Sequence, residues 1–98
     1  MNKEKEVEKY SNPNKVSKIA KKLGLNPVGI STRKEKKYMI YDNQGHVKHF
    51  GVISYEDYTL HNDQTRLDSF MKRNAKWYDA PKYTPAWLSA HLLWNPDY

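Results

Sequence analysis

Apolar side chains recur at helical spacing near the start of the chain. Four of them occupy the i, i+3, i+4 and i+7 positions of one helix face: Val16, Ile19, Ala20 and Leu23. The pattern predicts a helix over about residues 15–23, with Asn14 as its N-cap and Gly24 just past its C-terminal end. The remaining face of this helix is rich in lysine.

The middle of the chain is rich in strand-favouring residues and is broken by turn residues. The pattern predicts three short strands over 28–31, 37–41 and 46–50. In the second strand Tyr38 and Ile40 share one face, while the residues between and after them share the other. The turn residues of 42–45 join the last two strands. An antiparallel meander follows, with one face that needs a helix as cover.

The C-terminal part predicts two further helices. The first starts at a cap on Asn62 or Asp63 and runs to about Trp77. It has a stripe of Leu67, Phe70 and Met71, and a basic face of Arg66, Lys72, Arg73 and Lys76. The last helix begins at Thr84 and Pro85 and runs to about Trp94. Its apolar stripe comprises Trp87, Leu88, His91, Leu92 and Trp94.

These elements predict the fold class and the domain organisation. Residues 1–14 contain few apolar side chains and are expected to form a flexible charged tail. Residues 15–98 are expected to form a single α+β domain. In this domain an N-terminal helix precedes a three-stranded antiparallel meander that two C-terminal helices cover. Residues 52–60 are a connection in which Tyr55 and Tyr58 are expected to anchor the chain.

Charge and aromatic residues are unevenly distributed. Residues 1–37 hold eleven of the seventeen Lys and Arg, and residues 38–94 hold eleven of the thirteen aromatic residues. The net charge of the whole chain is +6. A basic N-terminal segment, which we call the front, followed by an aromatic-rich segment is typical of a small protein that folds and also binds an anionic partner.

The basic residues of the front are candidates for phosphate contacts. Those predicted to bind nucleic acid, without sequence preference, are Lys18, Lys21, Lys22, Arg33, Lys34, Lys36 and Lys37. The alternative is a solvated surface that only keeps the protein soluble. The aromatic residues are expected to fill the core, apart from a possible protein interface formed by Trp77, Tyr78, Trp87 and Trp94.

The sequence lacks the residues that a catalytic site or a metal site would need. There is no cysteine, and His46 and His49 lie on opposite faces of a strand, so no metal site and no cofactor are predicted. An enzyme built on His61 and Asp57 is disfavoured, because His61 is better explained as a residue that caps the following helix. Apolar runs are too short for a signal peptide or a membrane span.

Five blocks of the sequence resemble a known family. They are KKYMIYD at 36–42, HFG at 49–51, YEDYTxHxD at 55–63, RNAKW at 73–77 and YxPAxLSxxLLW at 83–94. Their order and spacing over 32–94 are similar to those of short basic proteins of unknown function from large double-stranded DNA viruses of eukaryotes, including giant viruses. Relatives often carry a more basic run where this chain has QTRLD at 64–68, which argues against nucleic-acid contact by that helix.

The resemblance implies a viral protein in the host cell interior or the virion. Together with the charge pattern, it predicts a non-enzymatic protein that associates with nucleic acid through phosphates. The alternative is a minor structural or cement protein of the capsid that acts through protein contacts. Neither hypothesis involves a membrane or a small-molecule substrate.

Overall fold

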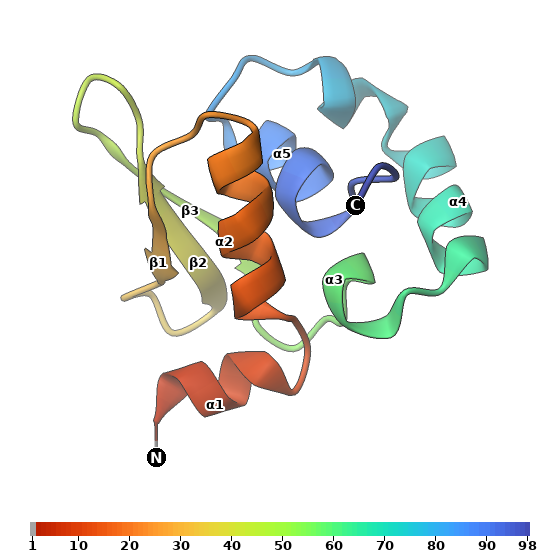
Figure 1. The fold of residues 1–98 in the computed structure, drawn as a ribbon, viewed down its shortest axis with the longest axis horizontal. Helices are drawn as coiled ribbons and strands as arrows, with labels where there is room; N and C mark the ends of the chain where they lie inside the picture. Colours follow the sequence, from red (N-terminus) through yellow and green to blue (C-terminus); the bar gives the residue numbers. More distant parts are fainter. Residues whose placement is uncertain (1) are drawn as a thin grey trace.

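Helices pack around a small three-stranded sheet in the computed structural model, which describes residues 2–98 (Figure 1). The elements are α1 (Lys3–Glu8), α2 (Pro13–Lys22), β1 (Val28–Ile30), β2 (Lys36–Tyr41), β3 (Val47–Val52), α3 (Tyr58–His61), α4 (Gln64–Arg73), the 3-10 helix η1 (Ala75–Asp79), α5 (Pro85–Leu88) and the π-helix η2 (Ser89–Leu93). The predicted α+β class and the order of its main elements are confirmed.

The sheet is an antiparallel meander in the order β1-β2-β3. Tyr38 lies opposite Phe50, and their ring centroids are 5.6 Å apart. Tyr38 and Ile40 are buried on one face, while Tyr41 is exposed on the other. The predicted strand alternation is therefore correct.

The core face of the sheet is covered by α2 together with α5 and η2. Val16 and Ile19 from α2 join Leu88 and Leu92 from the C-terminal segment in one buried cluster. Helix α4 packs mainly on η1 and lies across the molecule from the sheet (Figure 1). The expectation that two C-terminal helices cover the sheet is thus only half correct, because the N-terminal helix takes the place assigned to one of them.

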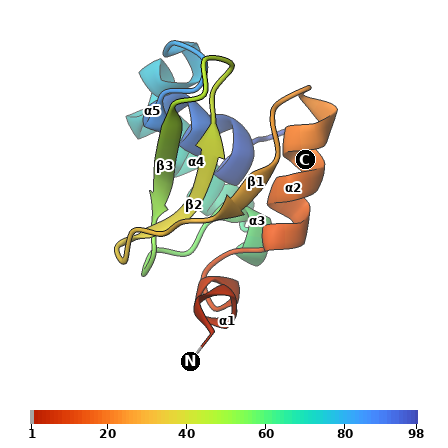
Figure 2. The same cartoon turned by 90° about the vertical axis from the view of Figure 1, so that its left-hand side faces the viewer.

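The prediction of a flexible tail over residues 1–14 is wrong. Residues 3–8 form α1, whose N-cap Asn2 accepts a hydrogen bond from the backbone N–H of Glu4 at 2.8 Å. Val7 is fully buried in the main core, so one apolar side chain is enough to dock this turn. Figure 2 shows α1 at one end of the molecule, below α2 and the sheet.

Some helices begin or end at other residues than predicted, because other residues than expected cap them. Helix α2 starts at Pro13 because Asn12, rather than Asn14, caps it by accepting from the N–H of Lys15. A short helix, α3, lies in the expected connection and ends at Asn62, whose φ of 53° stops it. The last helix begins at the Thr84 cap as predicted and then widens into η2.

Candidate functional site

The seven predicted phosphate-binding cations do not form one cluster. Six of them fall into two groups. The α2 cluster is Lys18, Lys21 and Lys22, all exposed, and the turn cluster is Arg33, Lys34 and Lys36, in or beside the turn between β1 and β2. Figure 1 shows the C-terminal end of α2 and this turn at opposite ends of β1. A ligand would meet these groups as two separate patches of positive charge.

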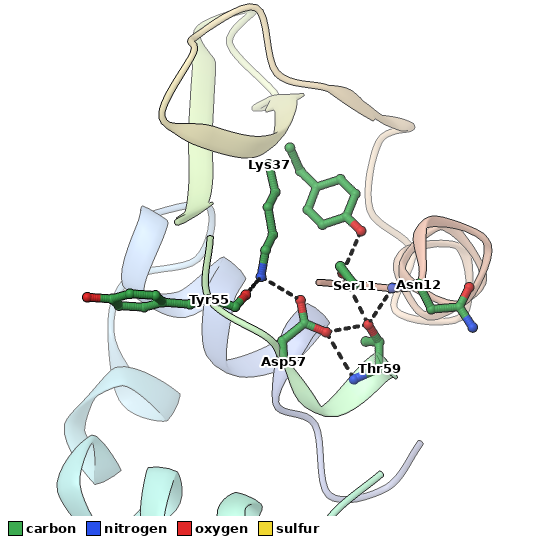
Figure 3. Close-up of polar contacts among 7 residues, drawn as sticks. Ser11, Asn12, Lys37, Tyr55, Asp57 and Thr59 are labelled. Carbon is green, nitrogen blue, oxygen red and sulfur yellow. Dashed lines mark hydrogen bonds and ion pairs between the residues drawn. The ribbon is translucent and has the colours of Figure 1, made fainter. Parts of the chain in front are cut away.

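The seventh cation, Lys37, is buried, so its prediction as a phosphate contact is wrong. Its side chain is 2% exposed, and its ammonium nitrogen lies 3.0 Å from Oδ2 of Asp57. It also donates to the backbone carbonyl of Tyr55 (Figure 3). Burial lowers the pKa of Lys37, while the neighbouring Asp57 carboxylate opposes that shift.

A glycine makes room for this lysine. Gly51 has a φ of 80°, and a Cβ placed on it would lie 3.0 Å from the Leu93 side chain and 3.3 Å from Cδ of Lys37. Only glycine adopts this conformation and this close approach without strain. The aliphatic part of Lys37 therefore packs between the sheet and η2 while its ammonium reaches Asp57.

Hydrogen bonds extend from Asp57 to the junction of α1 and α2 (Figure 3). Its Oδ1 accepts from the backbone N–H of Thr59 at 3.1 Å and from the Thr59 hydroxyl. Thr59 lies 3.2 Å from the Ser11 hydroxyl, which accepts from the Tyr38 hydroxyl at 2.6 Å. Burial raises the pKa of Tyr38, so this hydroxyl stays protonated and continues to donate.

This set of side chains, which we call the buried network, has a structural role. Its members are Ser11, Lys37, Tyr38, Asp57 and Thr59, and each is no more than 4% exposed. Each of these polar groups has a hydrogen-bond partner within the set. The Asp57 carboxylate is occupied by Lys37 and Thr59.

The cations of the two surface clusters are free of internal partners. Among residues 2–98, the only Lys or Arg side chains within 4.0 Å of a carboxylate oxygen are Lys37 and Arg66. Lys22 does lie 5.4 Å from the centre of the Tyr98 ring, a contact that leaves its charge uncompensated. The charge of both clusters is therefore available to an anion from solution.

Helix α1 adds a cation to the turn cluster. The ammonium of Lys3 donates to the backbone carbonyls of Ser31 and Arg33, which fixes the shape of the turn. His49 lies nearby, with Nδ1 2.7 Å from the Ser31 hydroxyl. Partial burial and the charge of Arg33 lower the pKa of His49, and Lys3 contributes further. Burial is the largest cause of this lowered pKa, and the nearby Glu35 carboxylate opposes it.

The four predicted interface aromatics do not form one exposed patch. Trp87 packs on His91 with ring centroids 4.4 Å apart. The hydroxyl of Tyr78 donates to the carbonyl of Trp94 at 2.6 Å, and burial raises the pKa of Tyr78 to about 12. Only Trp77 stays substantially exposed, at 38%.

A large groove, which the sequence did not predict, lies between α4 and β3; we call it the α4 groove. Its volume is about 1140 Å³. Arg66 and Arg73 come from α4, and Lys36 and Tyr55 come from the strand side. Residues of α5 and η2, among them Ala86 and Leu93, also line it.

Aromatic rings support one end of the α4 groove. Phe70 stacks on Trp94 with centroids 4.4 Å apart and an interplanar angle of 4°. Trp77 meets Phe70 edge to face at 5.6 Å. Tyr55, expected to anchor the connection, instead has a side chain that is 68% exposed. The two groove aromatics with the most exposed surface are thus Tyr55 and Trp77.

Residues 27–74 are similar to a family of unknown function (DUF5754). This segment contains the whole sheet, α3 and α4, and therefore Lys37 and Asp57 of the buried network as well as Arg66 and Arg73 of the groove. No curated protein and no solved structure matches the chain. Within residues 2–98, no helix is long and apolar enough to cross a membrane.

Proposed function

We propose that this protein is a non-enzymatic nucleic-acid-binding protein that contacts phosphates with little sequence preference. The observation that carries the proposal is the absence, within residues 2–98, of any carboxylate within 4.0 Å of the cations in the α2 and turn clusters. The buried network excludes Lys37 from the phosphate-binding set, which leaves six of the seven residues.

The physical basis is counterion release. Each phosphate neutralised by a protein cation releases condensed counterions, so affinity falls steeply as salt rises. Phosphate contacts position a protein on nucleic acid without reading its bases. The fixed turn cluster, with Lys3 holding its backbone, offers preorganised charge, while the α2 cluster offers long mobile lysines.

The setting proposed for this activity is viral. It rests on the resemblance of residues 32–94 to proteins of large double-stranded DNA viruses. In that setting the protein works in the host cell interior or in the virion, close to the genome.

A salt series tests the proposal. Fluorescence anisotropy of a labelled duplex should give a log–log slope of about −3.6 or steeper, which corresponds to about four neutralised phosphates. Replacing all six cations of the two clusters by Gln should abolish binding. A control replaces six other lysines by Gln, with the same change in net charge: Lys5, Lys9, Lys48, Lys72, Lys76 and Lys82. Equal loss in the two variants would show that net charge alone acts, and no binding at low salt would disprove the proposal.

A second candidate function is a minor structural or cement protein of a capsid. The exposed rings of Trp77 and Tyr55 favour it, because aromatic residues are enriched at protein interfaces. Trp87, Tyr78 and Trp94 are engaged inside the molecule, so the predicted four-residue interface is reduced to one residue. Copurification with empty capsids after nuclease treatment would support this candidate over the first.

A further inference from the structure

The α4 groove has a size that suits a polymer segment. Small-molecule sites are commonly about 300–1,000 Å³, and this groove is about 1140 Å³. It runs between two segments of the chain, α4 on one side and the end of β3 with the following loop on the other. An occupant would be held from both sides.

The charged residues of the groove select an anionic occupant. Arg66 and Arg73 are seven residues apart on α4, so they lie on one face of the helix, two turns apart. Lys36 lies on the opposite wall. The acidic lining residue, Glu56, is already paired with Arg66 at 2.8 Å. Arg73 and Lys36 have no such partner within residues 2–98.

The aromatic residues of the groove favour an occupant with unpaired bases, because the flat faces of such bases can stack on them. Trp77 is held edge to face by Phe70, which is itself stacked on Trp94, so its ring is preorganised. Tyr55 adds a second exposed ring to the lining of the groove. Base stacking on such rings is sequence-tolerant because every base has a flat face. A duplex keeps its bases stacked inside and has none to offer.

We propose that the α4 groove binds a short stretch of single-stranded nucleic acid, with bases on Trp77 and Tyr55 and phosphates at Arg73 and Lys36. This inference rests on the proposed function and adds a second site with its own preference. The α2 and turn clusters take phosphates of any nucleic acid, while the groove requires unpaired bases. An acidic peptide would satisfy the cations but would make no use of the two exposed aromatic rings.

The sequence pattern gave no reason to expect this contact. The segment at 64–68 is less basic than expected for a helix that binds nucleic acid. The structure nevertheless directs Arg66 and Arg73 to the same wall and places Lys36, from a distant part of the chain, across from them. Position in the fold, rather than local charge density, makes the site.

The test is a double variant, Tyr55→Ala with Arg73→Gln. The Tyr55 side chain is exposed and Arg73 has no ion pair within residues 2–98, so the fold should be retained. The matched control, Tyr41→Ala with Lys82→Gln, removes one exposed tyrosine and one cation outside the groove. Anisotropy is measured with a labelled twelve-residue oligothymidylate and with a twelve-base-pair duplex, with polyglutamate as a competitor.

We expect the groove variant to bind oligothymidylate on the order of tenfold more weakly than the control variant, since one stacked base and one phosphate contact are lost. Duplex binding should be equal in the two variants. Equal oligothymidylate binding would overturn the inference while leaving the proposed function intact. Wild-type protein that binds neither probe would overturn both. Displacement of oligothymidylate by polyglutamate from the control variant but not from the groove variant, at equal charge concentration, would identify an acidic protein as the occupant of the groove and overturn the inference.

Discussion

Lys36 and Lys37 are neighbours in one strand, yet they have opposite environments. Lys36 is half-exposed at the edge of the turn cluster and the α4 groove, with no carboxylate partner within residues 2–98. Lys37 is buried against Asp57. Alternation along the strand places Lys37 on the same face as the exposed Tyr41, so its burial against Asp57 does not follow from the strand pattern. One residue type thus leaves its charge open to solvent at one position and supports the fold at the next, and charge alone does not distinguish them.

The largest expected difference between them is in stability. Lys37→Met leaves the buried Asp57 carboxylate without its counter-charge, which should cost about 3–5 kcal/mol of unfolding free energy. Lys36→Met should change that free energy by less than about 0.5 kcal/mol. Urea unfolding of both variants measures the difference. Equal losses would mean that the ion pair contributes nothing to the fold.

A smaller effect is expected at the far end of the buried network. Tyr38→Phe removes the hydroxyl that donates to Ser11 and should cost about 1 kcal/mol. Tyr41→Phe, on the exposed face of the same strand, serves as the control and should leave the urea midpoint unchanged. If the midpoint of Tyr38→Phe also stays in place, the link between β2 and the α1–α2 junction is dispensable.

The smallest expected effect is the pH dependence of stability that His61 contributes. His61 is wedged between Tyr58 and Trp94, and its Nδ1 accepts from the N–H of Asp63 at 2.9 Å. Burial and the charge of Arg66 lower the pKa of His61, against the opposing pull of the nearby carboxylates. Because the folded pKa lies below the unfolded value of about 6.5, its contribution to stability is present above that pH.

That contribution should disappear as pH falls from about 6.5 through the folded pKa. Thermal unfolding between pH 7.5 and 5.0 measures it, with His61→Asn as a non-titrating control that can still accept from Asp63. The wild-type melting temperature should fall more over this range than that of the control. Parallel curves would show that His61 does not couple pH to stability.

The local pattern of the sequence was enough to predict the strands and the cores of the helices. The apolar face of α2 and the alternation of Tyr38 and Ile40 follow from residues close together in the chain, so they could be predicted. The burial of Lys37 could not, since it depends on Asp57 twenty residues later and on the space that Gly51 leaves. The missed helix α1 likewise depends on contacts with distant segments, since Val7 packs in their core and Lys3 donates to the turn between β1 and β2.

Only part of the candidate site could likewise be predicted from the sequence. The exposed cations of α2 and the turn could be identified from composition and helical spacing. That they form two patches follows from the length and direction of β1, which only the fold determines (Figure 1). The α4 groove brings together a strand end, a helix and two aromatic rings, and no local pattern encodes that meeting.

The most direct test of the account is to map amide chemical shifts of the protein during titration with oligothymidylate. The account predicts shifts in the α2 cluster, the turn cluster and the α4 groove, with Lys37, Asp57 and Thr59 of the buried network unchanged. Shifts confined to other surfaces, or none at low salt, would contradict the division of the lysines into those that bind and those that support the fold.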